Sequence, residues 1–156
     1  MEQVNPFKGK DIYNSPIEIG IRTLILLNEF YPTHLDMTQL VLYNHIVIHT
    51  EDFGGPQSLH PQLDDRAGEL AVLRSLIQDG LSLIQRFNLV SIENTPDGIF
   101  YTTTEECPAF VSLMTSSYSQ KLIEKAKWVA SVFSSLGKNQ VEEILHSKIN
   151  MWRFDA

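Results

Sequence analysis

The sequence predicts a mainly α-helical α+β fold with one β-hairpin, and three observations lead to this prediction. Apolar residues recur at three- and four-residue spacing in several segments of the chain, which is the period of helices that pack on a core. Helix-capping residues stand before most of these segments. A single pair of β-rich runs flanks Thr95-Pro96-Asp97-Gly98, and Pro-Asp-Gly suits a tight turn.

The first helix is predicted at about residues 16–31. Ser15 can cap its N-terminus, Pro16 supplies the fixed φ of a first turn, and Glu18 lies three residues after the cap. Burial is predicted for a wide apolar stripe: Ile17, Ile21, Leu24, Ile25, Leu26, Leu27 and Phe30. Pro32 ends this helix.

A second helix is predicted at about residues 37–50, because Asp36 is a candidate cap and Gln39 follows it three residues later. Apolar side chains at helical spacing support it: Leu40, Tyr43, Ile46 and Val47. The same stretch, LVLYNHIVIHT, is rich in β-branched residues, which leaves a strand as the alternative. The capping pair favours the helix.

A third helix is predicted after a loop at residues 51–63, and it opens at Asp64 or Asp65. Its stripe repeats every three or four residues: Leu70, Leu73, Ile77, Leu81, Ile84 and, at its end, Phe87. Gly68 and Gly80 lie inside this helix, where each glycine costs about 1 kcal/mol relative to alanine. Close packing of the backbone is therefore the expected reason for both glycines.

Beyond the hairpin, three more helices are predicted, at about residues 104–113, 117–136 and 138–149. Thr104 opens the first of them. Gly137 is expected as the residue just past the end of the middle helix. Asn139 and Glu142 form a capping pair for the last helix.

The order helix, helix, loop, helix, hairpin, helices is a winged-helix layout, in which the third helix occupies the DNA-recognition position. The 156 residues suit one domain. We predict an irregular N-terminal arm at residues 1–14 and a winged-helix-like core at residues 15–106. Residues 107–156 are predicted as a C-terminal helical extension that packs on the same domain.

The charge distribution argues against DNA binding by this layout. Net charge is −7 overall, with −9 over residues 1–106 and +2 over residues 107–156. The predicted wing, from Asn88 to Glu106, has four acidic residues and no basic one, whereas phosphate contacts require Lys and Arg. A basic cluster on a later helix, Lys121, Lys125 and Lys127, is interpreted as a solvated face.

Candidate sites for chemistry are sparse. His45 and His49 share one helix face, with Asp52 a turn further on, and such a trio could hold a metal. His60 and Cys107 are an alternative catalytic pair, although nothing in the sequence positions them together. Phosphate-binding and nucleophile-elbow motifs are missing. We therefore expect no enzyme activity, no cofactor and no metal.

The cellular compartment of the protein is predicted from its cysteine content and its hydropathy. Cys107 is the only cysteine, so no disulfide can form within the chain, which fits a reducing cytoplasm. The N-terminus has no apolar region typical of a signal peptide. No run approaches the about 18 apolar residues of a membrane span.

Four sequence blocks resemble the "middle component 2" family of prokaryotic ABC three-component systems. The resemblance runs from about residue 13 to 152 and is carried by YNSPIEIGIR at 13–22, LNEFYP at 27–32, SLHP at 58–61 and RAGEL at 66–70. It implies a small non-enzymatic adapter between an ABC- or SMC-like ATPase and a larger third component. Such systems are thought to serve in biological conflict, such as defence against phage or plasmids.

The resemblance also marks Ser58, His60, Arg66 and Glu69 as recognisable polar positions of the family. Arg66 and Glu69 lie at i and i+3, so they form either an exposed salt bridge or an interaction determinant beside His60. We predict that residues 54–70 bind a partner, with the loop ordered by packing on the second and third helices. Arg66→Ala or His60→Ala should weaken assembly with the ATPase and leave folding intact.

The alternative interpretation is a winged-helix transcription regulator that dimerises through its C-terminal helices. Amphipathic segments at 117–136 and 138–149, followed by Trp152 and Phe154, would provide the dimer face. The same segments could instead complete the core of one chain. DNA binding whose affinity falls steeply with salt would favour the regulator.

Overall fold

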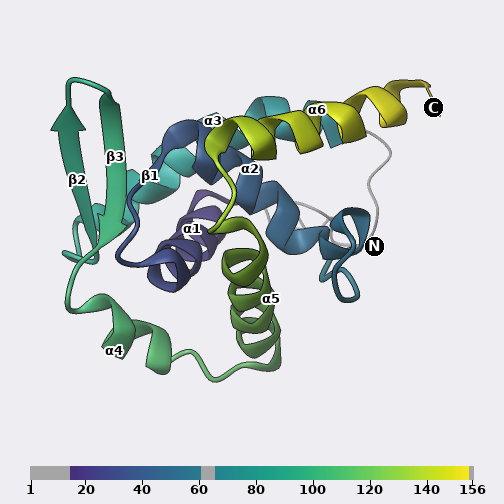
Figure 1. Ribbon diagram of the computed structural model, residues 1–156. Helices are drawn as coiled ribbons and strands as arrows, with labels where there is room; N and C mark the ends of the chain where they lie inside the picture. Colours follow the sequence, from purple (N-terminus) through teal and green to yellow (C-terminus); the bar gives the residue numbers. More distant parts are fainter. Residues whose placement is uncertain (1–14, 61–65, 155–156) are drawn as a thin grey trace, which may run out of the picture.

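A computed structural model describes residues 15–60 and 66–154. Within these residues the chain forms six α-helices, a short 3-10 helix and a three-stranded antiparallel sheet (Figure 1). The predicted arm at residues 1–14 lies outside the described residues. In chain order the elements are α1 (Pro16–Phe30), β1 (Leu35–Asp36), α2 (Met37–Ile48), η2 (Thr50–Phe53), α3 (Arg66–Gln85), β2 (Val90–Thr95), β3 (Gly98–Thr103), α4 (Cys107–Ser112), α5 (Ser117–Phe133) and α6 (Lys138–Phe154).

Helix α1 lies at the centre of the molecule and contacts α2, α3 and α5 (Figure 1). Its start follows the prediction, because Ser15 Oγ accepts a hydrogen bond from the Glu18 amide at 3.3 Å. The predicted stripe from Leu24 to Leu27 is buried. Ile17, in the first turn, is exposed instead of buried.

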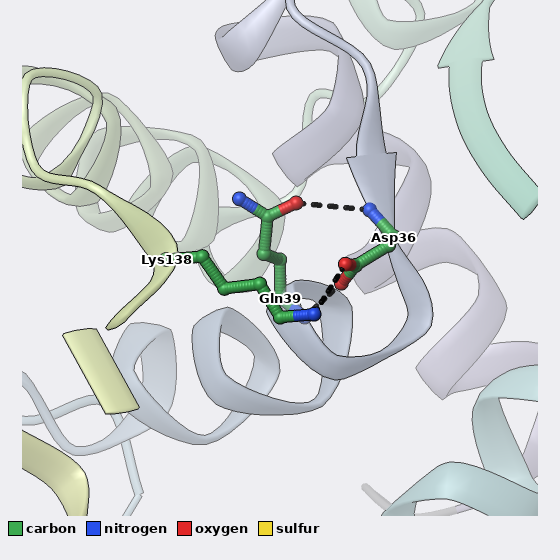
Figure 2. A network of polar contacts seen from close by, with 3 residues as sticks. All are labelled: Asp36, Gln39 and Lys138. Carbon is green, nitrogen blue, oxygen red and sulfur yellow. Dashed lines mark hydrogen bonds and ion pairs between the residues drawn. The ribbon is translucent and has the colours of Figure 1, made fainter. Parts of the chain in front are cut away.

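Helix α2 confirms the predicted helix and excludes the alternative strand for this segment. Its start is a capping box (Figure 2). Asp36 Oδ1 accepts from the Gln39 amide at 2.8 Å, and Gln39 Oε1 accepts from the Asp36 amide at 3.0 Å. Lys138 Nζ of α6 lies 2.8 Å from the second carboxylate oxygen of Asp36. The helix ends at Ile48, two residues before the predicted end, because the chain tightens into η2.

Helices α1 and α3 cross where two glycines meet. A Cβ added at Gly80 would lie 2.4 Å from the Pro16 carbonyl oxygen and 2.7 Å from the Gly20 nitrogen. Close packing therefore explains Gly80 as predicted. Phe87, predicted in the core stripe, is exposed, because α3 ends at Gln85 and the chain turns at Asn88, whose φ is 57°.

The sheet has the order β1-β3-β2. Strands β2 and β3 form the predicted hairpin, with Val90 opposite Thr103 and Thr95 opposite Gly98. The two-residue strand β1, which the sequence analysis missed, pairs with β3 and places Leu35 opposite Tyr101. The hairpin projects from one end of the molecule, and α6 ends on the other side of the view (Figure 1).

The C-terminal helices differ from the prediction in several boundaries and in one cap, and the last helix, α6, ends at Phe154 rather than at about residue 149. Helix α4 begins at Cys107, because Thr104 bonds back to Leu89 and Asn88 through its amide and hydroxyl. Helix α5 ends at Phe133. Gly137 precedes α6 rather than ending α5, and its amide donates to Gln140 Oε1 at 2.8 Å. Asn139 is therefore inside α6 and is not its cap.

The C-terminal helices pack on the first three. Helix α5 contacts α1 and α2, and α6 contacts α2 and α3. Helix α5 buries an apolar stripe at helical spacing: Leu122, Ala126, Val129 and Phe133. Among the helices of the described residues, none is long and apolar enough to cross a lipid bilayer.

Candidate functional site

The loop at residues 54–60 is held at both ends by hydrogen bonds to the end of α2 and to η2. Thr50 Oγ1 donates to the Pro56 carbonyl at 2.7 Å, and the Gly55 amide donates to the Thr50 carbonyl at 2.9 Å. The His60 amide donates to the Ile48 carbonyl at 3.2 Å. The loop thus leaves the helix and returns to it within one compact turn.

Ser58, a predicted partner-binding residue, is paired with Glu51 of η2. The Ser58 amide donates to Glu51 Oε1 at 3.0 Å, and Ser58 Oγ accepts from the Glu51 amide at 3.1 Å. These reciprocal bonds fix the middle of the loop. Ser58 therefore has a structural contact in addition to any role at a partner surface.

His60 and Gly55 attach the loop to α5. His60 Nε2 lies 2.7 Å from the Tyr118 hydroxyl. A Cβ added at Gly55 would lie 2.5 Å from the ring of Trp128, so only glycine fits there without displacement. The predicted contact of the loop with the second helix is confirmed by the bond from His60 to Ile48 of α2. The loop also contacts η2 and α5, which were not predicted as its neighbours.

Arg66 and Glu69 lie in the first turn of α3, on the far side of the undescribed residues 61–65. Their backbone positions keep the predicted i, i+3 spacing, and their side chains are not among those described. Asp64 and Asp65, the predicted helix caps, lie outside the described residues. Of the four predicted residues, the structure thus places Ser58 and His60 together in one anchored loop.

His45 and His49 are buried on one face of α2 and its C-terminal end, with ring centroids 4.8 Å apart. The Phe53 ring meets His45 edge-on at 6.0 Å. In residues 15–60 and 66–154, no group of three His, Cys, Asp or Glu side chains is arranged to hold a metal ion. These contacts are those of ring packing in a core.

Cys107 is fully buried at the start of α4, and burial raises the pKa of its thiol to about 11. A thiol with that pKa stays protonated at neutral pH, which is unfavourable for a nucleophile. In the described part of the chain, no hydrogen bond joins Cys107 to His60. The structure therefore does not assemble the alternative catalytic pair.

The hairpin and the chain beyond it present an acidic surface. Glu93, Asp97, Glu105 and Glu106 are all exposed. Glu93 Oε2 lies 3.0 Å from His34 Nδ1, in the loop between α1 and β1. From Asn88 to Gln120 the sequence contains no Lys, Arg or His. A polyanion would therefore meet a surface of net negative charge here.

A family model described as ABC-three component (ABC-3C) system Middle Component 2 matches residues 12–154. The chain belongs to this family. Among curated proteins and among solved structures, no match was found. As the middle component of a three-component ABC system, a Middle Component 2 protein has partner components.

Three residues that anchor the loop of this Middle Component 2 protein were not singled out from its sequence: Glu51, Tyr118 and Trp128. Tyr118 begins the apolar spacing of residues 117–136, which indicates a core position rather than a contact with the loop. Its hydroxyl was the available signal, because a half-buried tyrosine hydroxyl usually finds a hydrogen-bond partner. Gly55 gave no such signal, because its close approach to the Trp128 ring is a contact between residues far apart in the sequence.

Proposed function

We propose that the chain is a non-enzymatic adapter that links the ABC-type ATPase of its system to a third, effector component. The system would act in prokaryotic conflict, against phage or plasmids, in the cytoplasm. Family membership supports a role among partner components. The acidic surface of the hairpin and of the turn after it supports polypeptide rather than nucleic acid as the partner, because the four exposed carboxylates there have no Lys or Arg between Asn88 and Gln120.

We further propose that residues 15–106 form a winged-helix-like core. The order α1-β1-α2-α3-β2-β3 supports this, as does the pairing of β1 with β3 beside the hairpin. On this proposal α3 takes the place of a recognition helix, and the hairpin is the wing. Residues 107–156 would then be an extension that packs on the same domain through α5 and α6.

The proposed partner surface is the 54–60 loop with the first turn of α3, and it includes Ser58, His60, Arg66 and Glu69. The observation that carries this proposal is the anchoring of the loop. Bonds from Glu51 and Tyr118 hold Ser58 and His60 in one arrangement before any partner arrives. A loop that is already ordered loses less conformational entropy on binding.

Co-purification with the ATPase component tests this surface. His60→Ala and Arg66→Ala should each weaken the complex by about tenfold or more, which is the range of interface residues that dominate affinity. Arg74→Ala removes an exposed arginine further along α3 and is the matched control. If both variants bind the ATPase component with wild-type affinity, the partner surface lies elsewhere.

Tyr118→Phe separates a direct role of His60 from its role in shaping the loop. The variant keeps the aromatic ring and removes the hydroxyl that lies 2.7 Å from His60 Nε2. If His60 contacts the ATPase itself, Tyr118→Phe should bind nearly as well as the wild type. If the loop shape is what matters, Tyr118→Phe should weaken binding as much as His60→Ala.

The second candidate is a winged-helix transcription regulator that acts as a homodimer. The element order and strand pairing favour this candidate as well, since they are shared with DNA-binding winged helices. The two candidates differ in the charge that each requires of the hairpin. A gel shift of the isolated chain with duplex DNA at about 150 mM salt decides between them.

A further inference from the structure

Helix α3 has an apolar stripe outside the one that enters the core. Its core-facing side chains, Leu73, Ile77, Leu81 and Ile84, are buried. On another face Leu76 is half-buried and Leu83 is 36% exposed, and Phe87, just past the helix end, is 68% exposed. Leu76, which packs against the core, and Leu83 lie seven residues apart on one side of α3, and Phe87 lies in the turn that follows.

Two opposite charges flank Leu83 on this face. Asp79 lies four residues before Leu83 on the same side of α3, and Arg86 is the first residue past the helix end, in the turn at residues 86–88. Asp79 is exposed within α3, and Arg86 is exposed at its end. Neither has an ion-pair partner among the described residues. Seven residues separate the two charges by about 10 Å along the helix axis.

We propose that this face of α3 binds a second copy of the chain in an antiparallel, two-fold symmetric pair. A two-fold axis that passes beside Leu83 lies midway between Asp79 and Arg86. It therefore places Asp79 of each copy next to Arg86 of the other. The two Leu83 side chains meet at the axis. Phe87 of each copy reaches toward Leu76 of the other.

Self-complementarity is what favours a second copy over a different partner. A two-fold interface must present each charge together with its opposite on the same patch, and Asp79 and Arg86 meet that condition. The contact is small, so its affinity belongs to the weak class of interfaces. We expect dissociation constants from about 1 to about 100 μM. This inference does not depend on the proposed adapter function.

Sedimentation equilibrium of the full chain at concentrations from about 1 to about 300 μM covers the expected dissociation constants. The wild type should form dimers. Leu83→Glu should weaken the dimer by about tenfold or more, since it places two like charges at the axis. Asp79→Arg and Arg86→Asp should each weaken it, and the double variant should recover wild-type dimerisation because both ion pairs are restored in reverse.

Arg74→Asp is the matched control, because Arg74 is exposed on α3 but points about 120° away from Arg86. Its dimerisation should equal that of the wild type, and far-UV circular dichroism should show that every variant is folded. A wild-type chain that stays monomeric throughout would overturn the proposal. So would a charge-swapped double variant that dimerises no better than the single variants.

Discussion

Gly20 and Gly80 show how two residues without side chains set the spacing of α1 and α3. A Cβ on Gly20 would lie 2.8 Å from the Gly80 carbonyl oxygen, and a Cβ on Gly80 would lie closer still to α1. The nearest neighbours of a Cβ on Gly80 are all backbone atoms, which cannot rotate away as a flexible side chain can. The helices touch along their backbones. This contact leaves no room for a Cβ at Gly80, although glycine lowers the helix propensity there.

Gly80→Ala should therefore destabilise the chain. Overpacking of a tight site costs about 1–3 kcal/mol, which exceeds the gain in helix propensity of about 1 kcal/mol. Urea unfolding should show a lower midpoint with an unchanged slope. Gly137→Ala is the control, since its Cβ would meet only Gln140 Oε1 at 3.7 Å. Equal stability of Gly80→Ala and the wild type would contradict the backbone contact.

A buried polar network joins α1 to α2 at the residue scale. Arg22 Nε donates to Asn44 Oδ1 at 3.0 Å, and Asn44 Nδ2 donates to Thr23 Oγ1 at 3.0 Å. All three residues are buried. Buried polar groups of this kind are costly unless they are satisfied, so the network restricts how the two helices can slide against each other.

At the scale of elements, the capping box of α2 also joins α2 to α6 (Figure 2). Asp36→Ala should cost about 1–2 kcal/mol, because it removes the helix cap and the partner of Lys138. Lys138→Met should cost under about 1 kcal/mol, because the Lys138 side chain is 43% exposed and ion pairs near the surface contribute little. Thermal unfolding measures both, and equal losses would show that the ion pair rather than the cap stabilises this junction.

Helix existence could be predicted from this sequence more securely than helix boundaries. Ser15 and Asp36 each combine a capping side chain with an apolar stripe, and both predictions are confirmed. Gly137 and Asn139 were misassigned because glycine and asparagine serve at either end of a helix, and only the three-dimensional turn decides which. Strand β1 has two residues, too few for any periodicity.

The candidate site was less predictable, because its contacts join residues that are far apart in the sequence. Ser58 pairs with Glu51 across seven residues, whereas His60 meets Tyr118 across 58 residues. Nothing local to SLHP indicates a partner on α5. The resemblance could mark the loop as important, but only the folded chain shows that α5 holds it.

At the scale of the whole molecule, charge and architecture indicate different functions. The arrangement of helices and hairpin supports a winged-helix-like core, whereas Glu93, Asp97, Glu105 and Glu106 make the hairpin side acidic. Affinity for a duplex arises chiefly from Lys and Arg on phosphates. A fold supplies only the shape for a function, so the charge should decide.

We therefore expect the isolated chain not to shift duplex DNA in a gel at about 150 mM salt. A variant with Asp97→Lys, Glu105→Lys and Glu106→Lys should gain weak binding, because it replaces three repulsive charges with three phosphate contacts. That gained affinity should fall steeply as salt rises.

A second variant with Asp97→Asn, Glu105→Gln and Glu106→Gln removes the repulsion without adding cations, and it should bind less than the lysine variant. Tight, salt-sensitive binding of a specific duplex by the wild type would establish the regulator instead. In that case the phosphates would have to contact cations away from the hairpin, since Asn88 to Gln120 offers none.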